Sequence, residues 1–268
     1  MENTKIQNFK YLKVRQRNQK LLLIIFFVTL IITVQSPISA HASTIGMSKP
    51  GNYLGLVGWW TFDGKDTVWT SSTAATTLDK SGNGNTGTLT NMNVSTAPVP
   101  GKVGQGLYVG SNGAILLNSL VSSAKSYTFS VWINNKSVSA ASTNLFDSQT
   151  GRFLIGYGGC NSRVVSVYSN SLWKCVNNNG TNIQFLGDSA WHLLVFTLDN
   201  TTGVAKYYVD ALFTGTSTYV GTDLGNKFGI GSRYDNSFGN IVLQMDDVRV
   251  YSRVLSSSEI QQLYNMGK

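Results

Sequence analysis

The chain has 268 residues, only 13% of them charged, and its 21 Lys and Arg against 13 Asp and Glu give a formal charge of +8. Six basic residues and one acid lie within residues 1–42, so the remainder keeps 15 basic against 12 acidic residues, or +3. No Lys/Arg cluster remains in that part, and nucleic-acid binding is therefore not expected.

The first 42 residues have the pattern of an export signal. A basic stretch is followed by the unbroken apolar run from Leu21 to Val34, and then by the small-residue triplet Ala40-His41-Ala42. These are the three parts of a secretory signal peptide, and we predict cleavage after Ala42. The alternative is an uncleaved anchor, but the run is shorter than the ~20 residues that a membrane-spanning helix needs. We expect a secreted or cell-surface protein with no membrane segment after cleavage.

The mature part would have 226 residues, which suits one all-β domain. It is rich in Gly, Ser, Thr and Asn and in aromatic residues, a composition typical of many short strands joined by tight turns. Its two cysteines, Cys160 and Cys175, would lie in an oxidising compartment, so a disulfide between them is predicted. Two free thiols in neighbouring strands are the alternative.

In chain order, residues 43–54 form a polar lead-in that we expect to be flexible. The segments that read as strands are then separated by Gly/Asn/Asp/Ser turns such as residues 63–66 and 79–85. The main ones span residues 55–62, 127–134, 191–199, 204–209 and 228–232.

The last segment predicts a long strand followed by a capped helix. Apolar residues occupy odd positions up to Met245 and even positions from Val248, which predicts either a β-bulge at Asp246-Asp247 or burial of both faces. Ser256 with Glu259 forms a capping box before the helix, Leu255 and Ile260 a hydrophobic staple, and Gly267 suits the C-terminal stop.

Several of these stretches, in this order, resemble laminin-G-like domains of the concanavalin A-like lectin/glucanase superfamily. They are GWWTFDG, DKSGNGNTGTLTN, GKVGQGLYV, YTFSVWIN, WHLLVFTLD, VAKYYVDA and DDVRVYSRVLSSSEI. The resemblance implies an all-β jelly-roll sandwich of two antiparallel sheets with a short C-terminal helix over residues 55–268. Two departures stand out: Ala211 replaces the usual Gly, and the stretch YVGSNGAILL lacks the acids that often follow in this family.

The resemblance also implies a structural calcium ion near one rim. Calcium prefers carboxylate and carbonyl oxygens, and if the first and last strands are neighbours, Asp63, Asp79 and Asp246 can converge. The alternative is that Asp63 and Asp79 are turn residues and Asp246 marks the bulge.

Aromatic side chains are the candidates for stacking on sugar rings. Of the tryptophans, four lie in apolar strands and are expected in the core: Trp59, Trp60, Trp132 and Trp191. The aromatic residues expected to bind a ligand are Trp69, in a Ser/Thr-rich loop, and Trp173, Tyr157 and Tyr234, near turns or the cysteines.

Catalysis is disfavoured because the required side chains are missing. After residue 42, Glu259 is the single Glu and serves the helix cap, and His192 is the single His and is expected to have a structural, hydrogen-bonded role. Glycoside hydrolysis needs two facing carboxylates, and Asp246 and Asp247 as strand neighbours should point to opposite faces. We therefore expect a non-catalytic exported module that binds glycan or another surface ligand. A structural or adhesive protein is the alternative, and a polysaccharide hydrolase a more distant one.

Overall fold

The computed structural model describes residues 8, 10, 12–19, 53–118, 120, 126–135, 143–149, 154–157, 165–169, 172–175, 187–221, 224–237 and 242–268. The chain divides into two compact units, residues 1–48 and 49–268. In the first unit, residues 12–19 are helical. Most of the predicted signal peptide, with its apolar run, lies outside the described residues. Among the described residues, no helix has the length and hydropathy needed to cross a membrane.

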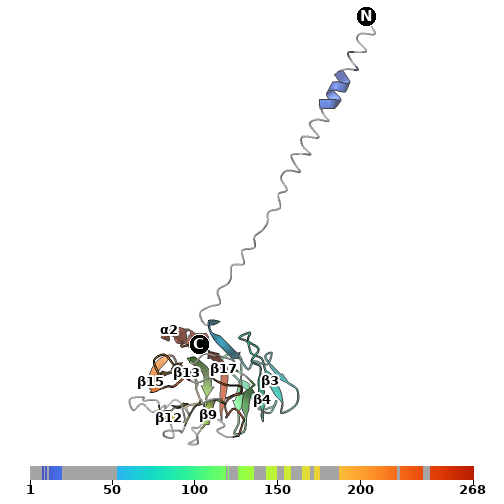
Figure 1. The fold of residues 1–268 in the computed structure, drawn as a ribbon. Helices are drawn as coiled ribbons and strands as arrows, with labels where there is room; N and C mark the ends of the chain where they lie inside the picture. The colour runs from blue at the N-terminus through green and yellow to red at the C-terminus, as the bar shows by residue number, and fades with distance from the viewer. Residues whose placement is uncertain are drawn as a thin grey trace. The chain divides into compact units, whose positions relative to one another are not determined.

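The second unit is built from two antiparallel sheets and a C-terminal helix, as Figure 1 shows. The first sheet has the strand order β15-β14-β13-β8-β17-β6-β5, and β1 pairs with part of β17. Its strands are β1 (Leu56–Trp60), β5 (Pro98–Pro100), β6 (Gln105–Val109), β8 (Tyr127–Asn134), β13 (Trp191–Asp199), β14 (Val204–Val209), β15 (Leu212–Thr218) and β17 (Leu243–Tyr251).

The second sheet has the order β12-β11-β10-β9-β16-β7-β4-β3-β2. Its strands are β2 (Thr67–Trp69), β3 (Ala75–Thr77), β4 (Gly87–Thr90), β7 (Ala114–Leu117), β9 (Thr143–Ser148), β10 (Leu154–Tyr157), β11 (Val165–Ser169), β12 (Leu172–Cys175) and β16 (Phe228–Ile230). The prediction of an all-β jelly-roll sandwich is confirmed. The first and last strands are neighbours, because β1 pairs with β17.

The main core lies between the sheets. Period-two alternation turns one face of each sheet inward, so aromatic side chains from both sheets meet there. Phe129 of the first sheet lies 5.1 Å from Phe146 and 5.9 Å from Phe228 of the second, measured between ring centroids. Burial of such rings supplies much of the driving force for folding.

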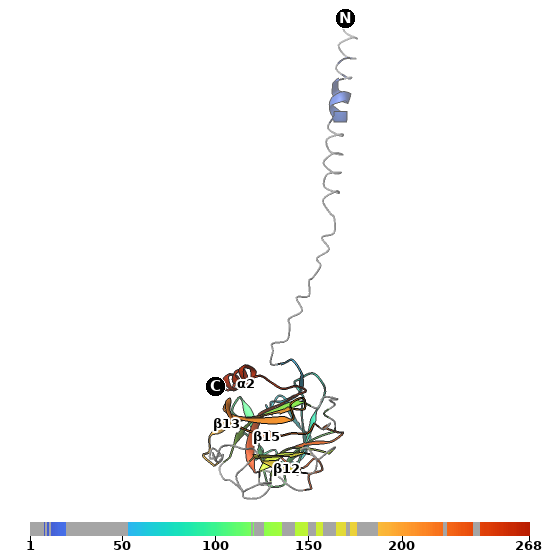
Figure 2. The ribbon, with the colours of Figure 1, turned by 60° about the vertical axis from the view of Figure 1, so that its left-hand side comes forward.

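A second core lies on the outer face of the first sheet, beneath helix α2 (Ser257–Met266). Ile260 and Leu263 of the helix are buried there with Trp132 and Val195 of the sheet. Figures 1 and 2 show α2 over the sheet that contains β13 and β15, with β12 of the other sheet below them in Figure 2. Strand β8 is therefore covered on both faces, which explains its almost unbroken burial.

The closing stretch forms the structure that its pattern predicts. The register of β17 against β8 shifts between Asp246 and Arg249, and Asp247 has a φ of 47°, so the predicted β-bulge is confirmed. Both faces of β17 are also largely buried. The capping box is confirmed as well: Ser256 accepts from the Glu259 backbone N–H, and Glu259 accepts from that of Ser256.

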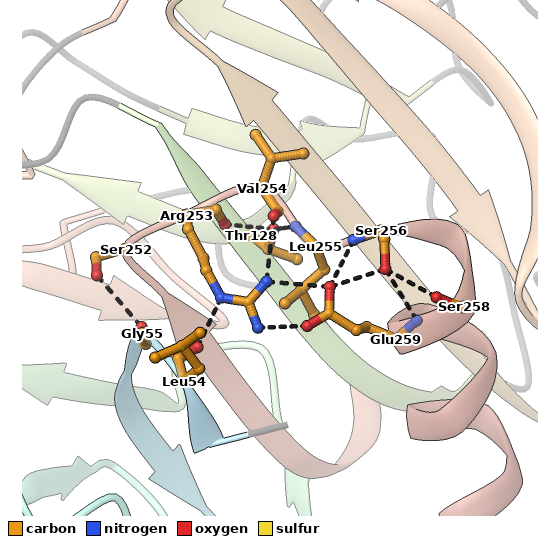
Figure 3. Close-up of polar contacts among 10 residues, drawn as sticks. All are labelled: Leu54, Gly55, Thr128, Ser252, Arg253, Val254, Leu255, Ser256, Ser258 and Glu259. Atoms are coloured by element: carbon orange, nitrogen blue, oxygen red, sulfur yellow. Dashed lines mark hydrogen bonds and ion pairs between the residues drawn. The ribbon is translucent and has the colours of Figure 1, made fainter. Parts of the chain in front are cut away.

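Figure 3 shows how Glu259 also ties α2 to the start of the domain. The guanidinium of Arg253 donates to both carboxylate oxygens of Glu259, and its Nε donates to the carbonyl oxygen of Leu54 at 2.7 Å. On the other side, the Thr128 hydroxyl of β8 accepts from the Leu255 N–H and donates to the Arg253 carbonyl. The segment between β17 and α2 is thereby fixed to three parts of the chain.

The hairpin between β14 and β15 contains the residue that departs from the family pattern. Its two connecting residues, Asp210 and Ala211, both have positive φ, 51° and 65°, as a type I′ turn requires. Such a position favours Gly because a Cβ is strained there. We expect Ala211→Gly to stabilise the protein by about 0.5–1 kcal/mol in urea unfolding.

The matched control for this prediction is Ala205→Gly in the neighbouring strand. Ala205 is buried in β14 with ordinary strand geometry, so its replacement should destabilise by about 1 kcal/mol. If both variants lose stability, the strain at Ala211 is negligible.

Candidate ligand-binding site

A cavity of about 200 Å³ lies where β1 and the turn after it meet β17. This is the junction of the first and last strands, and the side chains that line it are mostly charged or aromatic. The ones that form its walls are Trp59, Thr61, Asp63, Lys65, Asp66, Lys80, Asp246, Asp247 and Arg249. Val103 and Met266, 47% and 46% exposed, also line it and mark its mouth.

Trp59 and Arg249 form one wall because they are register partners in the β1–β17 pair. The Arg249 guanidinium lies 4.5 Å from the centre of the Trp59 ring, and its Nη2 is 3.1 Å from Asp247. The indole Nε1 donates to Asp247 Oδ1 at 2.5 Å. The half-buried indole is thus fixed by two contacts, with Tyr53 packed edge-on against it.

Asp63 and Asp66 come from the turn after β1. Asp63 Oδ1 accepts from the backbone N–H of Gln105 at 3.0 Å. The buried Asp66 accepts from Lys80 Nζ at 3.0 Å and from the Thr61 hydroxyl at 2.9 Å. Burial raises the pKa of Asp66, but these hydrogen bonds outweigh it and the net pKa lies below the ordinary value.

Asp246 and Asp247 both line the cavity, so the expectation that they point to opposite faces is wrong. The positive φ of Asp247 breaks the alternation that the expectation assumed. Asp246 is fully buried, and its carboxylate accepts from the N–H groups of Val103 and Asp247 at 2.8 and 2.7 Å. Burial, with the nearby Asp247 charge, raises the pKa of Asp246 to about 7 despite the Val103 bond.

The structure brings two of the three predicted calcium ligands to this cavity. Asp79 is not among its lining residues: its carboxylate instead accepts from the N–H groups of Trp59, Ser81 and Asn85, which organises the 79–85 turn. Within the part of the chain that is described, no group of three or more His, Cys, Asp or Glu side chains could hold a metal ion. Asp63, Asp79 and Asp246 do not form such a group, and each accepts from backbone N–H groups, so the calcium ion stays a prediction.

The four aromatic residues expected to bind a ligand do not gather at one place. Trp69 lies in strand β2 rather than in a loop, on a cross-strand row with Ala75, Leu89 and Ile115, and it packs against the main core. Trp173 lies in β12, at the opposite edge of the same sheet.

Tyr157 and Tyr234 lie between these edges. Tyr157 ends β10, and its side chain, like that of Trp173, lies outside the described residues. Tyr234 is half-buried in the turn after β16, where the Arg233 guanidinium lies 5.0 Å from its ring centre and contacts Asp235 at 3.5 Å.

The sequence pattern does not indicate that Trp59 lines the cavity, because Trp59 stands in an apolar strand and is expected in the core. Trp60 and Trp132 are buried as expected, whereas Trp59 and Trp191 are only half-buried. The signal that could have found Trp59 is the alternation in β1: if Trp60 faces the core, Trp59 faces the other way.

His192 has a structural, hydrogen-bonded role, as predicted. Its Nδ1 lies 2.7 Å from Asp210 and its Nε2 lies 2.9 Å from Asp188. Burial lowers the pKa of His192, but the two carboxylates outweigh it and the net pKa lies above the ordinary value. Asp210 also accepts from the Leu193 N–H, so the group holds the β14–β15 turn against β13.

Cys175, the last residue of β12, is disulfide-bonded. Cys160 lies outside the described residues, and its pairing with Cys175 stays the prediction made from the sequence.

Solved structures share this fold at low sequence identity. Domain 4 of AbnA, an extracellular arabinanase of Geobacillus stearothermophilus solved with arabinotriose, superposes with a TM-score of 0.60 at 20% identity. The match covers 78% of this chain and 98% of that one. The binding domain of botulinum neurotoxin DC, solved with SialylT, gives a TM-score of 0.57 at 14% identity over 81% of this chain.

The binding domain of Paraclostridial Mosquitocidal Protein 1 gives 0.55 at 16% identity over 79%. The chain spans only about half of each of these two toxin domains, 52% in both cases. At such identities the likeness shows the fold alone.

A search of the curated proteins finds no match. The sequence profile of the Laminin_G_3 family, described as the concanavalin A-like lectin/glucanases superfamily, matches residues 109–261, which is more than half of the chain. The resemblance seen in the sequence motifs is thereby confirmed. The chain belongs to the concanavalin A-like lectin/glucanases superfamily, in its Laminin_G_3 family.

Proposed function

We propose that the protein is an exported, non-catalytic binding module that recognises glycan through the cavity between β1 and β17. The observation that supports this most is the composition of that cavity: a fixed indole stands beside carboxylates and a guanidinium. A saccharide offers hydroxyl groups that both donate and accept hydrogen bonds, together with C–H faces that pack on apolar surface. Charged acceptors and donors around an aromatic wall suit both features.

The relatives support the same class of ligand. The arabinanase domain that the chain matches almost end to end was solved with arabinotriose, and one toxin binding domain with SialylT. Fold alone does not fix function, so these complexes make glycan the first class of ligand to test. The predicted signal peptide supports export to where such glycans occur.

The non-catalytic part of the proposal rests on the accessibility of the acids. Asp246 and Asp247 have different environments, the first with a pKa of about 7 and the second beside Arg249, a contrast that catalytic pairs also show. However, Asp246 is 0% exposed and binds backbone N–H groups, so it cannot reach a glycosidic oxygen in this conformation. We therefore expect bound saccharide to be recovered uncut.

A structural or adhesive role is the second candidate, and one surface supports it. Leu212 and Phe213 of the edge strand β15 are 72% and 58% exposed, and Leu172 of β12, a strand that contacts β15, is 57% exposed. Exposed apolar side chains at a sheet edge favour self-association. Sedimentation of the purified protein separates the two: concentration-dependent assembly without glycan binding would favour this second role.

The test of the proposed function is a binding titration with a steric block. Val103→Trp adds bulk at the exposed mouth of the cavity, and Val94→Trp adds the same bulk at a 41% exposed site that does not line it. Against arabinotriose and neutral hexose trisaccharides, we expect Val103→Trp to weaken binding at least tenfold and Val94→Trp less than twofold. A parallel titration in EDTA tests the calcium prediction, which expects affinity to fall when the ion is removed.

Two results would contradict the proposal. If no saccharide on a broad glycan array binds the unaltered protein, glycan recognition is wrong. If Val103→Trp binds as well as the unaltered protein while both melt at the same temperature, the ligand binds elsewhere.

A further inference from the structure

Acidic side chains outnumber basic ones around the cavity, and not every acid has a basic partner. Four carboxylates line it against three basic side chains, which gives a formal charge of −1 when all are ionised. Two of the three basic groups already have acidic partners: Lys80 lies 3.0 Å from Asp66, and Arg249 lies 3.1 Å from Asp247. An incoming anion would have to compete with these carboxylates for either cation.

The remaining basic residue, Lys65, is exposed and lies in the turn after β1. Water and salt screen the charge of this exposed side chain, so it attracts an anion only weakly at physiological salt. Its charge contributes, after that of Lys80, to the lowered pKa of Asp66, but Lys65 forms no ion pair with a described acid of the cavity.

Of the four acids that line the cavity, Asp63 is half-buried and has no cation at ion-pair distance among the described residues. Its Oδ1 accepts from the Gln105 N–H at 3.0 Å, and this oxygen packs where a side chain of Gly104 would stand. Gly104 has a φ of 70°, so the loop closes over Asp63 without a Cβ. The carboxylate is thus held in place, with acceptor capacity left for a ligand hydroxyl.

A fixed carboxylate without a cation discriminates between ligands by charge. A neutral saccharide can donate a hydroxyl to it in a charge-assisted hydrogen bond. A saccharide that carries a carboxylate would place a second negative charge near the first in a partly desolvated space, where repulsion is stronger than in bulk water.

We infer, on the basis of the proposed function, that the cavity selects neutral saccharides over acidic ones and that Asp63 is the residue that sets this preference. The preference follows from the uncompensated charge at Asp63, because the other acids that line the cavity are either paired with Lys80 or Arg249 or fully buried.

The test compares two probes of equal size, a neutral hexose trisaccharide and the corresponding hexuronic acid trisaccharide, in titrations at 50 mM and 500 mM salt. We expect the unaltered protein to bind the neutral probe at least tenfold more tightly at 50 mM salt. The ratio should shrink at 500 mM salt because the repulsion is screened.

Asp63→Asn removes the charge and keeps an oxygen for the Gln105 N–H. It should reduce the ratio about fivefold or more, chiefly through tighter binding of the acidic probe. Asp199→Asn is the matched control: Asp199 accepts from the Thr201 N–H in the β13–β14 turn and does not line the cavity, so the ratio should not change. Melting temperatures confirm that both variants fold.

The outcomes separate this inference from the proposed function. Equal binding of the two probes, or an unchanged ratio in Asp63→Asn, overturns the charge selection while glycan binding stands. If neither probe binds and no saccharide on the broad glycan array binds either, the proposed function is wrong and this inference with it.

Discussion

We expect the replacement of Glu259 with Ala to lower the free energy of unfolding by about 3 kcal/mol. Glu259 accepts from the Ser256 N–H at 2.8 Å, which completes the cap of α2, and loss of such a cap costs about 1 kcal/mol. It also accepts both N–H groups of the Arg253 fork, and hydrogen bonds to charged groups contribute about 1.5–3 kcal/mol. Urea unfolding at pH 7 measures the loss.

The stabilisation that Glu259 provides decreases as the pH falls. The hydrogen bond from Arg253, with those from Ser256, lowers the pKa of Glu259 to about 2 in the folded protein, against 4.5 for the free side chain. The unfolded state therefore binds more protons between these values, so the stabilisation is complete above about pH 5 and is lost as the pH falls through about 2. The difference between the Glu259→Ala variant and the unaltered protein should be smaller at pH 3 than at pH 7.

Two further variants test the cause. Glu259→Gln keeps an oxygen for the cap but removes the charge, so its loss should lie between zero and that of the Ala variant. Gln262→Ala changes an exposed position of the same helix and should alter stability by no more than about 0.5 kcal/mol. A loss at Gln262 equal to that at Glu259 would show that the cap and the Arg253 pair contribute little.

The end of the chain could be predicted in detail because its signals are local. The face change between Met245 and Val248 lies within four residues, and so does the capping box of Ser256 and Glu259. Such patterns fix backbone geometry without information from distant parts of the chain. The strand, the bulge and the cap are all found where the sequence predicts them.

The candidate site could be predicted only in part because it is made by distant residues. Trp59 and Arg249 meet across the β1–β17 pair, 190 positions apart, and nothing local to either residue indicates the contact. Asp63 and Asp246 were singled out by the expected neighbourhood of the first and last strands, and both line the cavity. Adjacent residues of a strand usually point to opposite faces. This rule fails for Asp246 and Asp247 because the bulge, with its positive φ at Asp247, interrupts the alternation.

Trp69 illustrates the opposite error. The Ser/Thr residues around it suggested an exposed loop, yet they form a short hairpin, and the register with Ala75 turns the indole toward the core. Composition reports that a segment is polar on average, whereas register decides which single residue faces inward.

The motif GKVGQG was recognised by resemblance, and the structure supplies the physical reason for its three glycines. A Cβ at Gly101 would lie 2.5 Å from the Asp246 carboxylate, and one at Gly104 would overlap that of Asp63. A Cβ at Gly106 would lie 2.8 Å from the Met245 carbonyl oxygen. The glycines let this loop pack directly against the acids that line the cavity and against β17.

The second large effect is therefore expected at Gly106. Gly106→Ala places a methyl group against the backbone of β17, which cannot move without separating paired strands, whereas a flexible side chain could rotate away. Overpacking typically costs about 1–3 kcal/mol, and we expect a loss near the upper end because the obstacle is backbone. Because β17 carries Asp246 and Asp247, we also expect the variant to lose glycan affinity under conditions where it is still folded.

Gly110→Ala is the matched control, because a Cβ there would meet only the ring edge of Tyr108 at 3.7 Å, an ordinary contact. Its stability should change by no more than about 0.5 kcal/mol, measured by urea unfolding beside Gly106→Ala. Equal small losses in the two variants would mean that β17 can shift away from Gly106 at little cost. In that case the close packing of the loop on β17 would not be what requires glycine at this position of the motif.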